Sequence, residues 1–383
     1  MKTFIKKHVP FIVMTSLLLL MIIFLIILQV LKQNTNIAEN WTRSFTRSYT
    51  SAFGIFNQNI VFSLTEASLI VSIISCVVFL AWSFCSFGNR QIWQGIHRLM
   101  MVVLVVMGAI TMYSATAGMA YYRKAVPIEK YEGEIKPEEF EAIITYYIED
   151  WNACADKLEF DDKGEIKMPY SNETFLNKLR DEFKRLPDNG YYGEYVPKAK
   201  PMSLSGIYGA FSIVGMYFAP LGEANYNTYS TNAEKPFYIV HELAHGTGVM
   251  REDDAQLVAT YLCLTSEDPY IRYSGYFNTF YRLFDLTGYI EDKPYERLAN
   301  MISSKIYAND DYHDKHWKGK NFMYELGDKI NSWYLRSFGQ RQGTESYNDT
   351  PTETDQSGKV IGLSHYQSIY VKYYYDTKMA KGE

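Results

Sequence analysis

The stretch FYIVHELAHGTGVMREDDA, residues 237–255, combines an apolar helical pattern with two histidines and a run of acids. Proline is tolerated in the first turn of a helix, so we expect a helix that begins near Pro236. Residues four apart on a helix are separated by only about 40° around its axis, so His241 and His245 project from one face. Their two imidazoles are therefore placed to share one metal ion.

Glu242 lies beside the first of these histidines, as in the motif H-E-x-x-H. In that motif the two histidines bind a zinc ion, and the glutamate takes a proton from a water molecule at the metal. The surrounding helix is otherwise apolar, and buried imidazoles and carboxylates are costly without a partner. The alternative is that the three side chains only satisfy one another by hydrogen bonds.

A catalytic zinc site normally has a third protein ligand and leaves the fourth position open. Gly248 matches the glycine of the longer metzincin pattern, but Arg251 stands where that pattern has its third histidine. Because a cation cannot be a ligand, a metzincin site is excluded. Glu252 shares a helical stripe with Ala255, and a small residue there allows close approach to the first helix. We therefore expect Glu252 as the third ligand, with Asp254 as the alternative.

The first third of the chain contains three uncharged apolar stretches, residues 10–31, 67–87 and 99–119, each long enough to cross a bilayer as a helix. A cleaved signal peptide is the alternative for the first stretch. Lysines before it, and Arg90 and Arg98 between the second and third, indicate cytoplasmic ends. We expect a multi-pass protein of the cell membrane with a cytoplasmic N-terminus and an extracytoplasmic C-terminal domain.

The expected fold class is a membrane-anchored α+β protein, mainly α, with a membrane domain at residues 1–123 and a zincin-like domain with a small sheet at residues 124–383. Residues 206–230 are rich in glycine, aromatic and β-branched residues, which favours one or two strands. The polar stretch 339–359 is expected to be a surface loop, with a flexible lid as the alternative. Helical patterns cover residues 137–160, 172–186, 236–249, 252–264, 268–286, 296–306, 310–338 and 358–375.

Composition excludes some classes of function. The net charge is −5 and no long run of one sign occurs, so the chain has no electrostatic footprint for a nucleic-acid partner. Four cysteines are too few for a disulfide framework, and we expect them to be unpaired. A bridge between Cys154 and Cys263 is the alternative for an extracytoplasmic domain.

Two further groups of residues are candidates for substrate contacts. The segment GEANYN, residues 222–227, is expected to form an edge strand that aligns a peptide, or to let Glu223 and Asn225 orient the metal ligands. A peptidase also needs a donor for the developing oxyanion, and the candidates by residue type are Tyr276, Tyr273, Arg272 and His313. His313 and His316 together are an alternative second metal site, and a solvated helix face is the simpler interpretation.

Seven short motifs of the chain are distinctive in combination: MAYYR (119–123), SGIYGAF (205–211), GEANYN (222–227), HELAH (241–245), REDDAQ (251–256), DPYIRYSGYFN (268–278) and DDYHDKHWKG (310–319). Together they resemble a bacterial family of unknown function, family 3810, with three N-terminal membrane helices and a zincin-like domain. Glu252 matches the family pattern R-E-D-E-A-N after HELAH, whereas Asp254 and Gln256 depart from it.

The residues and the resemblance together predict a membrane-anchored zinc-dependent metallopeptidase. His241, His245 and Glu252 are expected to bind Zn²⁺, and Glu242 is expected to act as the base. The expected partners are a peptide or protein substrate and the lipid bilayer, with no nucleic acid. The alternative is a non-enzymatic cell-envelope protein in which a metal only braces the fold.

Overall fold

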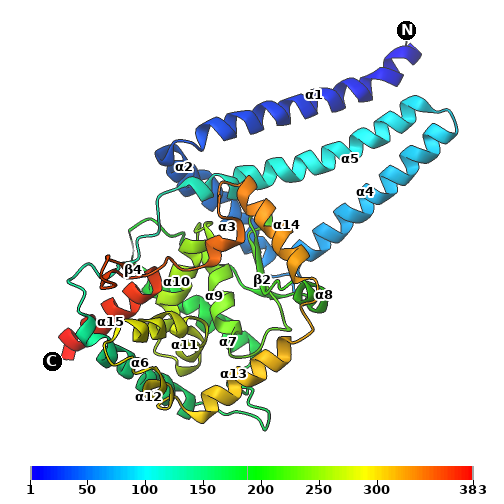
Figure 1. Cartoon of the computed structure of the whole chain (residues 1–383). Coiled ribbons are helices and arrows are strands. Elements are labelled where there is room, and N and C mark those ends of the chain that lie inside the picture. The colour runs from blue at the N-terminus through cyan, green and yellow to red at the C-terminus, as the bar shows by residue number, and fades with distance from the viewer. Residues whose placement is uncertain (1, 188, 382–383) are drawn as a thin grey trace. The chain divides into compact units, whose positions relative to one another are not determined.

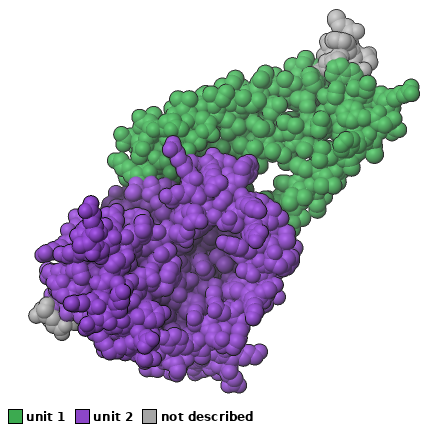
Figure 2. Space-filling view, in the orientation of Figure 1, with its two compact units in different colours: residues 1–124, 218–223 green, residues 125–217, 224–383 purple. Residues whose placement is uncertain are grey.

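A computed structural model describes residues 2–187 and 189–381 of the chain. The chain divides into two compact units (Figure 2). The first consists of residues 1–124 and 218–223, and the second of residues 125–217 and 224–383. The short segment 218–223 therefore belongs to the membrane unit, although its place in the sequence assigned it to the domain that follows.

The membrane unit contains three helices that are long and apolar enough to cross a bilayer, Val9–Leu31, Leu64–Gly88 and Ile92–Tyr122. This confirms the expectation of a membrane protein with three candidate spans. The third begins earlier than predicted because Arg98 is accommodated inside it, with its guanidinium 3.8 Å from the ring centroid of Trp82. Stacking on an aromatic face offsets part of the cost of the charge.

Helices in the membrane unit also fill the segment between the first two spans, which the sequence patterns left unassigned. The elements of this unit are α1 (Lys2–Leu31), α2 (Thr35–Trp41), the π-helix η1 (Thr42–Thr46), α3 (Arg47–Asn57), α4 (Leu64–Gly88), α5 (Ile92–Tyr113), the π-helix η2 (Ser114–Gly118), η3 (Ala120–Tyr122) and η6 (Ala219–Leu221). Helix α5 packs against both α4 and α1 (Figure 1).

Glu223 explains why the segment 218–223 belongs to the membrane unit. Its buried carboxylate accepts hydrogen bonds from Ser63 Oγ at 2.9 Å, from the backbone N–H of Thr65 at 2.9 Å and from Asn57 Nδ2 at 2.6 Å. A helix N-terminus has unsatisfied N–H groups and a positive partial charge, so a carboxylate is stabilising at the start of α4. These bonds give Glu223 a structural role, in place of the predicted one beside the metal ligands.

The second unit is mainly helical, with two small sheets, and α9, α10 and α11 pack together at its centre (Figure 1). Its helices are η4 (Pro137–Glu139), α6 (Phe140–Asp156), α7 (Asn172–Glu182), η5 (Phe183–Arg185), α8 (Ser205–Ala210), α9 (Lys235–Gly246), α10 (Glu252–Leu264), α11 (Pro269–Phe284), η7 (Asp285–Tyr289), α12 (Tyr295–Ala299), α13 (Ser304–Trp317), α14 (Tyr324–Ser337), η8 (Gly343–Tyr347) and α15 (His365–Lys381).

Its larger sheet has the strand order β1-β3-β2, formed by β1 (Lys200–Pro201), β3 (Glu223–Tyr226) and β2 (Gly215–Phe218). The smaller sheet pairs β4 (Glu353–Thr354) with β5 (Val360–Gly362) in antiparallel fashion. Strands β2 and β3 lie within residues 206–230, where the sequence predicted one or two strands, whereas β1 precedes that range. The order matters for function, because β3 is the central strand and β2 is an edge.

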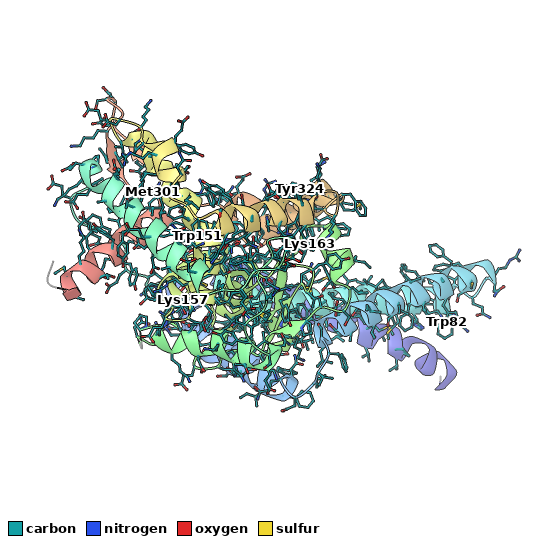
Figure 3. The ribbon with its side chains drawn as sticks, turned by 90° about the horizontal axis from the view of Figure 1, so that it is seen from below. Trp82, Trp151, Lys157, Lys163, Met301 and Tyr324 are labelled. Carbon is teal, nitrogen blue, oxygen red and sulfur yellow. The ribbon has the colours of Figure 1, made fainter. Side chains whose placement is uncertain are left out.

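Aromatic side chains from distant helices build much of the core of the second unit. Tyr147, Tyr276 and Tyr370 are buried against one another, with ring centroids 4.8–6.3 Å apart. Trp151, marked in Figure 3, packs beside Tyr276. The Tyr147 hydroxyl donates to the carbonyl oxygen of Tyr370, and the Tyr276 hydroxyl donates to Asp150. A buried tyrosine is stable here because its polar end has a partner.

Some predicted helix boundaries are wrong. The pattern over residues 310–338 forms two helices, α13 and α14, because Gly319 has a φ of +74°, a left-handed conformation that interrupts the helix. The last helix begins at His365 instead of residue 358, since β5 occupies the start of the predicted range.

The cysteines of the second unit are free. Cys154 and Cys263 are both buried and unpaired, so the alternative of a bridge between them is not realised. The Arg272 Nε–H lies 3.4 Å from Cys154 Sγ and donates to it.

Candidate metal centre

The candidate site is built where α9 ends and α10 begins. The two histidines lie in the last two turns of α9, and Glu252 is the first residue of α10. Between them Gly248 has a φ of +98°, which glycine adopts without strain. This short turn brings the start of α10 back against the end of α9.

Three side chains meet at this point. The Nε2 atoms of His241 and His245 are 3.1 Å apart, and Glu252 Oε2 lies 3.1 Å from the first and 3.3 Å from the second. All three residues are buried. A tetrahedral zinc ion with bonds of about 2.0–2.2 Å separates its ligand atoms by roughly 3.3–3.6 Å. The observed spacing therefore fits a zinc ion after a small outward movement of the ligands.

Hydrogen bonds behind the histidines orient them for metal binding. The Nδ1–H of His245 donates to the carbonyl oxygen of Val249 at 2.6 Å, so Nε2 is the ring nitrogen that faces the other two ligand atoms. The Nδ1 of His241 and the Oε1 of Gln256 are both buried without a well-aligned hydrogen bond in the described structure. The Nδ1–H of His241 is a donor and the Oε1 of Gln256 is an acceptor. Burial lowers the pKa of His241, and the interaction with Gln256 opposes that shift.

The protonation states of the site residues depend on how closely their side chains lie to one another. Burial alone would raise the pKa of Glu252, but the two histidines outweigh burial and lower it to about 2. Burial opposes protonation of His245, yet the Glu252 carboxylate raises its pKa to about 9. Burial raises the pKa of Glu242 to about 8, and the nearby Glu252 adds to this shift, although His245 and the backbone of Tyr217 work in the opposite direction. Glu252 is thus the anionic ligand, whereas Glu242 is poised to exchange a proton near neutral pH.

Strand β2 packs directly against Glu242. A Cβ atom added to Gly215 would lie 2.5 Å from Glu242 Oε1, so only glycine leaves room for the carboxylate. The backbone of Tyr217, two residues on, hydrogen-bonds to the same carboxylate, and its ring centroid is 6.2 Å from that of His245. The strand that borders the site is therefore β2.

The prediction that residues 222–227 form the edge strand is wrong, because they include the central strand β3. Asn225 is buried and its Nδ2 donates to the carbonyl oxygen of Met216 at 3.3 Å, across to β2. Its role is to brace the sheet that carries the edge strand.

We expect Gly215→Ala to lower any activity that depends on Glu242 by roughly 100-fold, because a misplacement of about 1 Å at a reacting group has that effect. Metal content should be unchanged. The control is Gly288→Ala, where an added Cβ meets no atom within 4 Å. Equal turnover by the two variants, measured together with their metal content, would contradict the close approach of β2 to the base.

Tyr347 also reaches the site, and the sequence patterns did not single it out. It ends η8, its ring centroid lies 6.2 Å from that of His241, and its hydroxyl accepts a hydrogen bond from Asn331 Nδ2 at 3.5 Å. Burial and the nearby Glu252 raise its pKa well above the ordinary value, so the hydroxyl stays protonated. The chain has 33 tyrosines, and this one stands in a polar stretch that resembled a surface loop, so no local signal identified it.

Asp254, the alternative third ligand, points elsewhere. Its carboxylate lies 3.1 Å from Arg251 Nε and accepts the backbone N–H of Val126 at 3.3 Å. Of the two acids, Glu252 is the one that reaches the histidines.

The four oxyanion candidates from the sequence are engaged in other hydrogen bonds. Tyr273 donates to Asn309 Oδ1 at 2.9 Å, and Arg272 forms an ion pair with Asp150, the acid that also accepts from Tyr276. His313 is 3.0 Å from Glu234 Oε2. None of these contacts, within residues 2–187 and 189–381, involves the group at His241.

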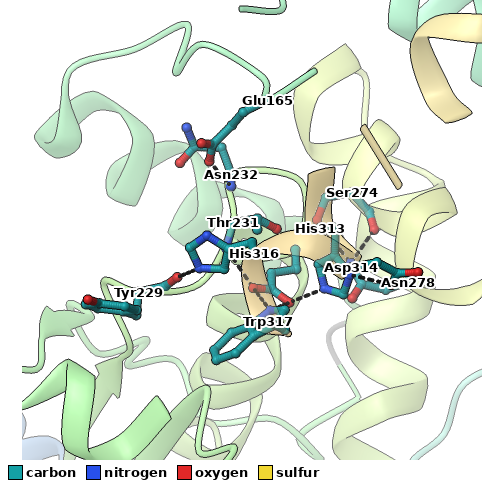
Figure 4. Close-up of polar contacts among 11 residues, drawn as sticks. Glu165, Tyr229, Thr231, Asn232, Ser274, Asn278, His313, Asp314, His316 and Trp317 are labelled. Carbon is teal, nitrogen blue, oxygen red and sulfur yellow. Dashed lines mark hydrogen bonds and ion pairs between the residues drawn. The ribbon is translucent and has the colours of Figure 1, made fainter. Parts of the chain in front are cut away.

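His313 and His316 do not form a second metal site. Figure 4 shows that they point to different partners. His313 bonds to the Glu234 carboxylate, which also accepts the indole N–H of Trp317 at 3.1 Å, whereas His316 Nε2 donates to the carbonyl oxygen of Tyr229 at 2.6 Å. Among the described residues, the one group with three metal-ligand atoms in reach of one another is His241, His245 and Glu252.

Comparison with known proteins gives a family without a function. A family model described as "Protein of unknown function (DUF3810)" matches residues 41–352, which is most of the chain. The chain belongs to this family. The DUF3810 match includes two of the three membrane spans, all three members of the metal-ligand group, and Tyr347. No curated protein and no solved structure matches the chain.

Proposed function

We propose that this DUF3810 protein is a membrane-anchored, zinc-dependent metallopeptidase that hydrolyses peptide bonds outside the cytoplasmic membrane. The observation that carries the proposal is the buried group of His241, His245 and Glu252, with its ligand atoms 3.1–3.3 Å apart and Glu242 next to the first ligand in sequence. Zn²⁺ bound there would supply a Lewis acid that polarises a carbonyl and acidifies a water molecule.

Each residue of the site has a distinct task in this proposal. The two histidines and Glu252 hold the ion. Glu242 accepts the proton of the attacking water and passes it to the amine that leaves when the peptide bond breaks. Edge strand β2 presents its backbone to an extended substrate, which adds to the sheet as a further strand.

Tyr347 is the proposed donor to the oxyanion that develops on the scissile carbonyl. The Tyr347 phenol is protonated, hydrogen-bonds to the Glu252 carboxylate and accepts from Asn331. Its O–H therefore lies at the ligand group, where it can donate to a developing negative charge. We expect Tyr347→Phe to lower kcat by roughly 100-fold, the usual effect of removing one oxyanion donor, with little change in KM. The measurement is steady-state cleavage of a peptide, with Tyr276→Phe in the core as a control for loss of a tyrosine hydroxyl. A larger change in KM than in kcat would assign Tyr347 to substrate binding instead.

The orientation follows from the basic residues near the membrane spans. Lysines before the first span, and Arg90 and Arg98 between the second and third, favour a cytoplasmic N-terminus. With three spans, the second unit then lies outside the cytoplasm. A protease added to intact cells should cleave the second unit, and its protection until the cells are lysed would reverse the orientation.

A non-enzymatic envelope protein with a structural metal is the second candidate. Structural zinc sites are normally closed by four protein ligands, whereas catalytic sites have three and an open position. The described residues supply three ligand atoms at this point, which favours the catalytic type.

The test is to purify the full chain in lipid nanodiscs, measure its zinc content and incubate it with a diverse peptide mixture analysed by mass spectrometry. We expect about one zinc per chain, cleavage that stops when a chelator removes the metal, and recovery when zinc is restored. Bound zinc without any cleavage would favour the structural alternative, and absence of bound zinc would overturn both.

A further inference from the structure

Helix α14 has an apolar stripe on its outer side. Leu326, Ile330 and Trp333 are spaced by four and three residues, so they lie within about 60° of one another around the axis. Their exposed fractions are 46%, 54% and 71%. Leu335, about 180° away from Leu326, is fully buried. The helix therefore presents one face to the core and a second apolar face outward.

A large exposed aromatic residue stands just before the helix. Phe322, two residues before α14 begins at Tyr324 (Figure 3), is 76% exposed. Single exposed apolar residues are ordinary, but large apolar side chains gathered on one face indicate a binding surface. We call Leu326, Ile330 and Trp333 the outer patch.

The charge around the outer patch is opposite to that of the chain. Residues 318–341 contain five basic and two acidic side chains, a net charge of +3, whereas the whole chain has a net charge of −5. One of the two acids, Asp328, is turned toward η8, where it accepts a hydrogen bond from Thr344 Oγ1. Exposed basic residues Lys329 and Arg336 lie on the helix beside the patch.

We propose that the outer patch docks onto the surface of a lipid bilayer that contains anionic lipids. A helix with Trp, Ile and Leu on one side and Lys and Arg beside them is suited to lie in the membrane interface, with its apolar side chains among the acyl chains. A bilayer is always within reach, because the same chain carries three candidate membrane spans. Such a tether raises the effective concentration of the surface, so modest contacts suffice.

Docking would also bear on the segment that carries Tyr347. On the inner side of α14, Ser332 Oγ lies 2.8 Å from Thr344 Oγ1, and Asn331 donates to the Tyr347 hydroxyl. Helix α14 and η8 are thus one packed element, and a bilayer that holds the outer patch holds this element. The proposal itself does not depend on peptidase activity.

Spin labels on the full chain in nanodiscs test this proposal. The background carries Cys76→Ser and Cys85→Ser, and keeps Cys154 and Cys263, which are buried. One label is attached after Ile330→Cys, and the control label after Lys315→Cys on α13, where the side chain is 72% exposed. The readout is the ratio of collisions with oxygen, which enters lipid, to collisions with a water-soluble nickel chelate.

We expect this ratio to be about tenfold higher at position 330 than at position 315 in nanodiscs with anionic lipid. Equal ratios at the two positions would show that the outer patch faces water and would overturn the proposal. A label at 330 that is immobile and shielded from both reagents would also overturn it, because a protein surface would then cover the patch. Leu326→Cys provides a second label on the same face if the first variant does not fold.

Discussion

Glu242→Gln should retain its metal and lose nearly all peptide cleavage. Glutamine has the same size and fits beside Gly215, but its amide cannot accept the proton of the attacking water. Removal of a general base lowers turnover by roughly 10²–10⁴-fold. The measurement is kcat on a cleaved peptide together with the zinc content of the same sample.

The matched control for this variant is Glu234→Gln, at the start of the same helix, where the carboxylate bonds to His313 and Trp317 away from the metal-ligand group. That variant should keep its turnover if it folds. Proteolysis by Glu242→Gln at the wild-type rate would rule out Glu242 as the base, whereas loss of zinc in the same variant would show a structural role.

Glu252→Ala should abolish stoichiometric zinc binding, and Asp254→Ala should preserve it. Removing a residue that hydrogen-bonds to a metal ligand lowers the metal affinity by roughly 10–100-fold. Removing a ligand itself should therefore lower the zinc affinity by more than that range. Asp254 faces Arg251 and Val126 instead, and its removal leaves the three ligand atoms in place. Zinc content after dialysis against a weak chelator measures the difference.

Folding has to be checked for both variants, because the Glu252 carboxylate also pairs with the buried His245, whose pKa it raises. Circular dichroism and thermal unfolding serve this purpose. Retention of zinc in Glu252→Ala with loss in Asp254→Ala would reverse the ligand assignment. Loss in both, with both folded, would show that Asp254 orients α10 through Arg251.

Local sequence determined the parts of the protein that depend on residues close together in the chain. The helical period places His241 and His245 on one face whatever the rest of the fold does. The arginine at position 251 excluded one class of site, and the helical stripe that Glu252 shares with Ala255 favoured Glu252 as the third ligand. Hydrophobic length alone identified three candidate spans, because a bilayer core imposes a minimum length on any helix that crosses it.

Only the tertiary structure decided which distant residues complete the site. Gly215 and Tyr347 reach Glu242 and His241 from a strand and a 3-10 helix far away in sequence, and nothing in their local patterns distinguishes them from other glycines and tyrosines. The sequence placed Glu223 in a strand that contacts the substrate, yet its carboxylate accepts hydrogen bonds at the start of the membrane helix α4. Periodicity describes how one element is amphipathic, whereas strand order and contacts between elements arise from the packing of the whole chain.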